Sequence, residues 1–180
     1  MLLFQDENPS WLYSVMQGAT TTWERWDSYT IEDGFGDAGM NSFNHYAYGA
    51  VAGWMFSSMA GIGYDPSAPG FENILFAPRP NEKMKSVEAS YESAYGTVTA
   101  KSYFEEERWN YEITVPANAS ATVKLPVSTS EGVTLNGKNA TSLSEADGVR
   151  SVIVRDGYAV FELVAGTYSF SMNSAVLYRT

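Results

Sequence analysis

The sequence contains no cysteine and a single histidine, His45. The lack of cysteine excludes disulfide bonds and thiolate metal sites, but it leaves the cellular compartment open. With one histidine and no thiol, a zinc site is not expected. The acidic loop Glu32–Asp37 lacks the alternating oxygen ligands of a calcium-binding hand. We therefore expect no metal and no cofactor.

Basic residues are also scarce. Eleven lysines and arginines stand against 21 aspartates and glutamates, which gives a net charge of −10 without any basic cluster. This charge repels polyanions, so we expect no nucleic-acid partner, whereas a neutral substrate is compatible with it. No apolar run approaches the about 18 residues of a membrane span, and we expect no membrane partner. The start, Met1–Glu7, lacks the basic region and the apolar length of a signal peptide.

Aromatic residues, by contrast, are abundant. They make up 14% of the chain and include 12 tyrosines and 5 tryptophans. That is more than the core of a domain this small requires, so some of these rings should line a binding surface or pack against a larger partner.

The hydrophobic period changes near residues 61–70. Before this point apolar residues recur at spacings of three and four, which predicts one helix over Ser42–Ala60 with a buried apolar stripe. Asn41 or Ser42 could cap its start, and Gly61 could end it. The stripe consists of Phe43, Tyr46, Ala47, Ala50, Val51, Trp54, Met55 and Met59. A shorter helix is expected over Pro9–Gln17, and residues 19–40 are expected to form an ordered loop with at most one helical turn.

After Gly70 the period is two, which is typical of strands exposed on one face. The turn pair Asp156-Gly157 between two apolar runs predicts a tight hairpin. Nine short strands are expected: Ile74–Phe76, Val87–Ser93, Gly96–Phe104, Arg108–Val115, Ala121–Pro126, Gly132–Leu135, Ser151–Arg155, Tyr158–Leu163 and Gly166–Met172. The predicted fold class is mixed and mainly β, with an antiparallel β-sandwich over 70–180 that follows a short helical segment over 1–65.

One carboxylate stands out among the aromatic residues. Glu24 lies between Trp23 and Trp26, and His45 follows in a second aromatic stretch. Sugars are bound by this combination, because an aromatic face covers the C–H side of the ring while polar groups take the hydroxyls. Glu24 is the candidate catalytic residue. The alternative is a surface glutamate that pairs with Arg25.

The other candidate substrate-binding residues have alternatives of their own. His45 could donate a hydrogen bond to a ring hydroxyl, with Asn44 beside it, or it could be a packed or capping histidine. At least one of Trp23 and Trp26 is expected to be a stacking platform, although both could belong to the core. Asp27 could bind a sugar hydroxyl or cap a helical turn. In the sandwich, Tyr91, Tyr95, Tyr103 and Trp109 are expected in the core, and residues 105–107 at a solvated hairpin tip.

The motifs that carry these residues resemble the bacterial α-L-rhamnosidases, glycoside hydrolase family 78. They are Pro9-Ser-Trp11, Gly18-Ala-Thr-Thr21, Trp23-Glu-Arg-Trp-Asp27, Phe35-Gly-Asp37 and Met40-Asn-Ser-Phe-Asn-His-Tyr-Ala47, followed by Ala77-Pro-Arg-Pro80 and Val115-Pro-Ala-Asn118. The resemblance implies the last helices of an (α/α)6 barrel and the C-terminal β-sandwich of such an enzyme. It also implies that Glu24 is the general base of an inverting mechanism and that His45 lines the sugar site.

The same resemblance places the general acid of the family in an earlier segment. Hydrolysis with inversion needs two carboxyl groups, so the 180-residue chain is expected to be inactive by itself. Its expected partner is a rhamnose-containing glycoside. The unpartnered apolar stripe further predicts a homo-oligomer through the helical segment. Two alternatives stay open: a carbohydrate-binding module, and a structural module that completes another polypeptide.

Overall fold

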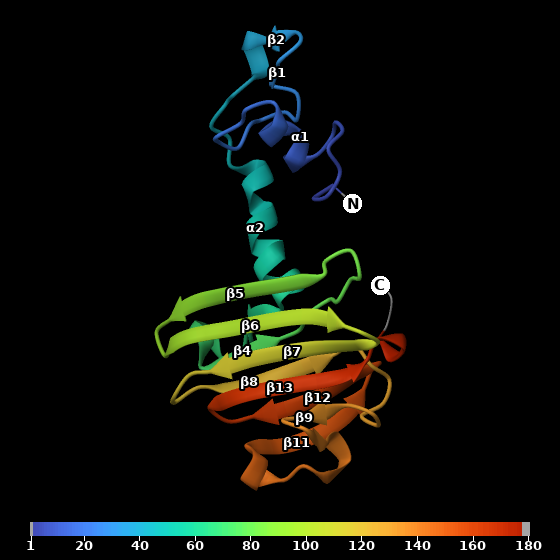
Figure 1. Ribbon diagram of the computed structural model, residues 1–180. Coiled ribbons are helices and arrows are strands. Elements are labelled where there is room, and N and C mark those ends of the chain that lie inside the picture. The colour runs from blue at the N-terminus through green and yellow to red at the C-terminus, as the bar shows by residue number, and fades with distance from the viewer. Residues whose placement is uncertain (1, 178–180) are drawn as a thin grey trace. The chain divides into compact units, whose positions relative to one another are not determined.

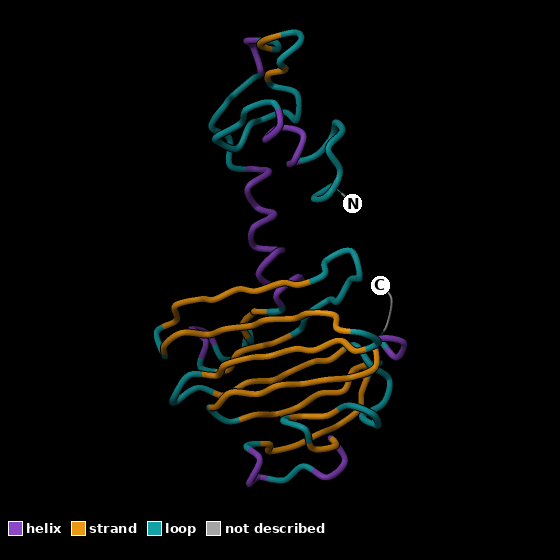
Figure 2. The backbone as a smooth tube through the Cα atoms, in the orientation of Figure 1, coloured by secondary structure: helices purple, strands orange, loops and turns teal. Residues whose placement is uncertain are grey.

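The computed structural model describes residues 2–177, which form two compact units, one up to Gly53 and one from Trp54 onward. Figure 1 labels their helices and strands, and Figure 2 shows that strands dominate the second unit and loops the first. Along residues 2–177 no helix has the length and apolar character that crossing a membrane requires.

The first unit is built mostly from loops around one short helix. Helix α1 spans Trp11–Met16, and the hydroxyl of its N-cap Ser10 accepts a hydrogen bond from the Tyr13 amide at 2.8 Å. This cap places Pro9 before the helix, so the prediction of Pro9 in the first turn was wrong. The chain leaves α1 through Gly18 at φ +91°, a left-handed conformation that glycine adopts without steric cost.

The loop after α1 contains a hairpin that the sequence did not indicate. Strand β1 (Tyr29–Thr30) pairs antiparallel with β2 (Gly34–Phe35), and a 3₁₀ turn over Ala38–Met40 follows. Asp37 caps this turn by accepting the Gly39 amide at 2.8 Å. The hydrogen bonds of these local turns therefore account for the ordered loop that was predicted over residues 19–40.

The long helix predicted over 42–60 is shorter and less regular than expected. It begins with a 3₁₀ turn over Ala47–Ala50, continues as α2 (Val51–Trp54), where the unit boundary falls, and ends as a π-helix over Met55–Ala60. Neither Asn41 nor Ser42 caps it, but Gly61 ends it as predicted, at φ +79°. The apolar stripe is not buried: Tyr46 is 88% exposed, and Trp54 and Met55 are about 40% exposed.

The second unit is a β-sandwich with a six-stranded and a five-stranded sheet (Figure 1). The first sheet has the order β10-β9-β13-β7-β6-β5, and the second has the order β11-β12-β8-β4-β3. The bounds of the first sheet's strands are β5 Ser86–Ser93, β6 Gly96–Glu105, β7 Arg108–Val115, β9 Thr134–Leu135, β10 Lys138–Asn139 and β13 Gly166–Asn173. Those of the second are β3 Ile62–Tyr64, β4 Asn73–Phe76, β8 Ser120–Leu125, β11 Val149–Arg155 and β12 Tyr158–Leu163. Short 3₁₀ turns cover Pro69–Phe71, Ala140–Ser142, Glu145–Asp147 and Ser174–Val176.

The sandwich confirms the predicted antiparallel architecture. Each of the nine predicted strands is present, with bounds that differ by a few residues at most, and Asp156-Gly157 joins β11 to β12 as a tight hairpin. Two short strands were missed, β3 and β10, and one strand pair, β4 with β8, is parallel.

The core lies between the two sheets. Strand β7 alternates strictly, so that Trp109, Tyr111, Ile113 and Val115 are buried while the residues between them are more exposed. Each fully buried large apolar side chain contributes about 1.5–3 kcal/mol relative to an exposed one. Of the tyrosines expected in this core, Tyr91 and Tyr95 were placed wrongly, because they are 42% and 36% exposed. Tyr91 stacks on Phe71. Tyr103 is only partly buried, and its hydroxyl donates to Glu112 at 2.9 Å.

Candidate functional site

Two stretches of the first unit run antiparallel to each other, and we call them the paired segments: residues 21–24 and 42–45. The Glu24 amide donates to the Ser42 carbonyl oxygen at 2.8 Å, and the His45 amide donates to the Thr22 carbonyl oxygen at 2.8 Å. The Thr21 hydroxyl also donates to the Phe43 carbonyl oxygen. These bonds bring the two principal candidate residues, Glu24 and His45, 21 positions apart in the chain, into one local structure.

The carboxylate of Glu24 is held by the opposite segment. Its Oε2 accepts a hydrogen bond from the Ser42 amide at 2.8 Å, so Ser42 bonds both the backbone and the side chain of Glu24. A backbone N–H to a carboxylate is a charge-assisted bond, which orients the acceptor. Within residues 2–177 the other oxygen, Oε1, has no hydrogen-bond partner. The partly exposed carboxylate is therefore fixed on one side and open on the other. Glu24 forms no ion pair with Arg25, whose guanidinium contacts the Met40 sulfur at 3.2 Å.

His45 precedes the helix instead of lying in its first turn. Its Nδ1 accepts the amide of Ala47, the first residue of the 3₁₀ turn, at 3.3 Å, whereas the N-cap residue Tyr46 makes no side-chain cap. A neutral imidazole with Nδ1 as acceptor carries its proton on Nε2. The ring lies parallel to Tyr46, with centroids 5.5 Å apart. The site thus contains one oriented N–H donor at Nε2.

The two tryptophans have different environments. Trp23 is only 6% exposed and packs edge-on against Phe43, which favours the core interpretation for this residue. Trp26 is partly exposed, stacks on Tyr48 at 3.8 Å between centroids, and meets Trp11 edge-on at 4.8 Å. Both indoles line a cavity of about 300 Å³ beside residues 20–22, but neither Glu24 nor His45 lines it.

The remaining candidates are exposed. The Asn44 amide donates to the Ser42 hydroxyl at 3.2 Å, and its side chain makes no hydrogen bond within residues 2–177. The carboxylate of Asp27 likewise has no hydrogen-bond partner in that range, so it does not cap a helical turn. Both polar groups are free to contact a ligand.

Sequence reasoning missed the supporting residues of this site. Ser42 holds Glu24 through its backbone, and Tyr48 supplies the ring on which Trp26 stacks. Backbone groups carry no residue-specific signal, so no sequence pattern could have identified Ser42. Tyr48 could have been noticed as an aromatic residue that lies off the apolar stripe.

The sequence that forms this site is similar to known protein families. Residues 1–59 match the model of the bacterial alpha-L-rhamnosidase 6 hairpin glycosidase domain, and residues 61–140 match that of the bacterial alpha-L-rhamnosidase C-terminal domain. The chain belongs to the bacterial α-L-rhamnosidase family. Its two matched rhamnosidase domains meet at residues 59–61, just before β3 begins.

Curated rhamnosidases support the assignment. The chain is 37% identical over 171 residues to an alpha-L-rhamnosidase of Formosa agariphila, which covers 94% of this chain and 18% of that protein. It is 36% identical over 175 residues to an alpha-L-rhamnosidase of Streptomyces avermitilis. This match covers 95% of this chain and 15% of that protein. The chain therefore spans less than a fifth of the length of these relatives.

Solved rhamnosidases have the same fold. The structure of the Streptomyces avermitilis alpha-L-rhamnosidase complexed with L-rhamnose matches with a TM-score of 0.79 and 35% identity, covering 96% of this chain and 16% of that one. The structure of the alpha-L-rhamnosidase from Dictyoglumus thermophilum matches with a TM-score of 0.75 and 29% identity. This match covers 95% of this chain and 18% of that one.

Proposed function

We propose that this chain supplies the general base and part of the sugar site of an inverting α-L-rhamnosidase, which hydrolyses terminal α-L-rhamnosyl residues from glycosides. The observation that supports this most directly is the pairing of residues 21–24 with 42–45. It holds the Glu24 carboxylate with one oxygen open and places the donor-bearing His45 on the adjoining segment.

In this mechanism Oε1 of Glu24 takes a proton from a water molecule. The water oxygen forms a bond to the anomeric carbon as the bond from that carbon to the glycosidic oxygen breaks. The departing oxygen takes a proton from a carboxylic acid on another part of the barrel, and the sugar is released with inverted configuration. The Ser42 amide orients the carboxylate during proton transfer.

The neighbouring residues would hold the sugar. His45 donates from Nε2 to a ring hydroxyl, while Asn44 and Asp27 offer polar groups with no other hydrogen bond in the described part of the chain. Trp26 suits a stacking platform better than Trp23, because Trp23 is buried. An aromatic face against the C–H side of a deoxysugar gains apolar contact without competing for its hydroxyls.

We further propose that the 180-residue polypeptide is inactive by itself, because the family's general acid lies in an earlier segment. Assays with an aryl α-L-rhamnoside should show no turnover above the buffer rate. The same chain should restore turnover when it replaces the matching C-terminal residues of the Streptomyces avermitilis relative. In that hybrid, Glu24→Gln should lower turnover by about 10²–10⁴-fold. Its dissociation constant for L-rhamnose should change little, because a general base acts on water in the transition state.

The matched control is Glu32→Gln, which removes an exposed carboxylate from the same unit. Hydrolysis by the isolated chain that Glu24→Gln abolishes would refute the proposed inactivity. A hybrid whose turnover survives Glu24→Gln would refute the role of general base.

We also propose that the isolated chain self-associates through its helical segment. Trp54, Met55 and Phe56 lie consecutively in one helix and each exposes about two fifths of its surface. Adjacent large apolar residues on a surface favour a partner, and a second copy of the same face gives a two-fold dimer.

A further inference from the structure

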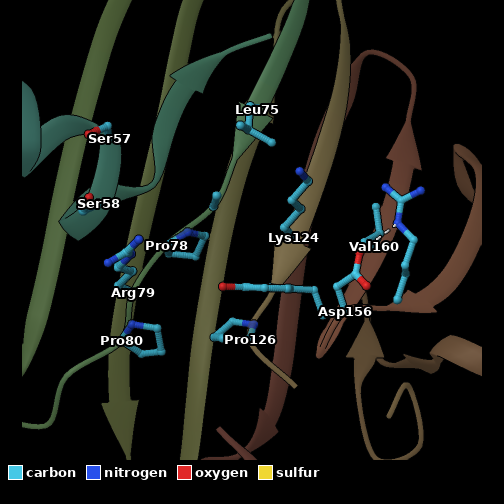
Figure 3. Close-up of a pocket in the computed structure, with 13 residues that line it drawn as sticks. Ser57, Ser58, Leu75, Pro78, Arg79, Pro80, Lys124, Pro126, Asp156 and Val160 are labelled. Atoms are coloured by element: carbon cyan, nitrogen blue, oxygen red, sulfur yellow. Dashed lines mark ion pairs between the residues drawn. The ribbon is translucent and has the colours of Figure 1, made fainter. Parts of the chain in front are cut away.

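The β-sandwich contains a cavity of about 430 Å³ on the outer face of its five-stranded sheet (Figure 3). Strand β8 turns Val123 and Leu125 into the core, so Lys124 between them points to the opposite face. Lys124 lines the cavity. It lies next to Val160 of β12, with which it pairs in the sheet. The segment after β4 forms another side of the cavity.

Cationic side chains line this cavity from different sides. Arg79, Lys124 and Arg155 line it, whereas Asp156 is the only acidic residue among the described residues that do so. The positive charge of Arg155 is partly neutralised by Asp156, because the Arg155 Nε lies 3.6 Å from the Asp156 Oδ2. The ion pairs found within residues 2–177 include neither Arg79 nor Lys124. This concentration of positive charge is notable in a chain with a net charge of −10.

The position of Arg79 is fixed by the backbone. Its amide donates to the Ser58 carbonyl oxygen at 2.8 Å, which joins the segment after β4 to the end of the π-helix. Figure 3 shows Arg79 between Pro78 and Pro80, on the side of the cavity near Ser58. The guanidinium presents a planar fork of donors, which matches the paired oxygens of a carboxylate or a sulfate group.

The walls suit a ligand larger than a bare ion. Pro78 and Pro126, both largely buried, form apolar parts of the wall, while Tyr158 adds an aromatic ring and Ser57 a hydroxyl. A cavity of this volume falls within the range of small-molecule sites, about 300–1,000 Å³. Apolar rings, a hydroxyl and cations together match a sugar ring that carries an anionic substituent.

We propose that this cavity binds an acidic saccharide, whose carboxylate or sulfate ester is held by Arg79 and Lys124. The choice of a saccharide rests on the proposed function, since a glycoside hydrolase encounters sugars. The binding itself is independent of Glu24, which belongs to the other unit. The sandwich then acts as a second sugar-binding surface, one that selects glycans by charge.

Titration calorimetry on the full chain tests this with three matched sugars: D-glucuronic acid, D-glucose 6-sulfate and D-glucose. At least one charged sugar should bind, and D-glucose should bind at least tenfold more weakly. Lys124→Gln and Arg79→Gln should each weaken binding about tenfold, as expected for loss of a charge-assisted hydrogen bond. Raising the ionic strength should also weaken it. Lys101→Gln is the control, since it removes one positive charge from the six-stranded sheet. Thermal melts confirm that each variant is folded.

The two charged sugars distinguish the source of the anion. Preference for glucuronic acid assigns the cavity to uronic acids, and preference for the sulfated sugar assigns it to sulfated glycans. Equal binding of inorganic sulfate with the same dependence on Lys124 would overturn the saccharide assignment. Lack of binding at millimolar concentration, or an equal effect of Lys101→Gln, would overturn the site. None of these results depends on hydrolysis, so failure here and failure of the catalytic proposal are separable.

Discussion

The hydroxyl of Tyr111, fully buried on β7, donates a hydrogen bond to the carbonyl oxygen of Ala60 at 2.8 Å. Ala60 is the last residue of the π-helix, and its carbonyl belongs to the group that a helix end leaves without an internal partner. One tyrosine of the six-stranded sheet therefore ties down the end of the helix that leads into β3.

Tyr111→Phe should lower the free energy of unfolding by about 1–2 kcal/mol at pH 8, because the Ala60 carbonyl loses its buried donor. Burial raises the pKa of the Tyr111 hydroxyl well above its usual value. The unfolded state therefore releases this proton first, and the stability due to Tyr111 is present below about pH 10 and is lost as the pH rises above it. Urea unfolding at pH 8 and pH 11 should show the wild type losing more stability than Tyr111→Phe. An equal loss in both proteins would contradict this. Tyr103 and Tyr168, whose pKa values are also raised, are present in both and cancel in the comparison.

Gly61→Ala should be more destabilising than Gly70→Ala. Both glycines have φ near +80°, so alanine is strained by about 1–2 kcal/mol at either position. At Gly61 an added Cβ would also lie 2.5 Å from the Pro78 nitrogen, whereas at Gly70 nothing lies within 4 Å. Thermal melts of the two variants separate backbone strain from steric clash. Equal melting temperatures would show that Pro78 moves away freely.

In the hybrid enzyme described above, His45→Phe should weaken the binding of L-rhamnose about tenfold and affect turnover less. The substitution keeps an aromatic ring beside Tyr46 but removes the Nε2 donor and the Nδ1 acceptor of the Ala47 amide. Tyr46→Phe is the control, because it keeps the stacked ring. Measuring KM and kcat separately tests whether His45 binds the sugar or takes part in the reaction. A fall in kcat without a rise in KM would contradict the binding role.

Trp54→Glu should convert the proposed oligomer into a monomer, measured by light scattering at tens of micromolar. A charge in the middle of an apolar contact surface is costly to bury. Ala52→Glu adds the same charge at a small exposed residue of the same helix and should have less effect. A wild-type chain that is already monomeric would refute self-association.

A polypeptide that begins near Gly70 should remain folded, because the sandwich closes its own apolar faces. We propose 70–180 as the minimal sandwich and 1–65 as the helical end of the barrel. A polypeptide that begins at Ala60 should be more stable by about 1.5–3 kcal/mol, because it keeps β3 and the buried Ile62. Circular dichroism and limited proteolysis of both test this. A molten product from both starts would show that residues before Ala60 are integral to the core, and a molten product from the Gly70 start alone would show that β3 is required.

The period-two pattern predicted the sandwich well because its strands bury alternate residues against each other within this chain. Strand β7, from Arg108 to Val115, was predicted with the bounds that it has. The helix was predicted less well. Gly49 and Gly53 weaken it, and its stripe is half exposed, so local 3₁₀ and π geometry replaces a regular α-helix. For the site, side-chain chemistry pointed to Glu24 and His45, but their support comes from backbone groups, which no residue type reveals.

The parallel pair of β4 and β8 has a consequence for how the sandwich forms. Asn73 lies beside Ser120, 47 residues later, so β4 and the β3 strand attached to it cannot join their sheet until β8 exists. The meander β5-β6-β7 is complete by then, because its pairings are between neighbours in sequence. Closing a long loop is slow compared with local pairing. We therefore expect β3 and β4 to stay unpaired with β8, and their apolar residues to stay exposed, until a late stage of folding.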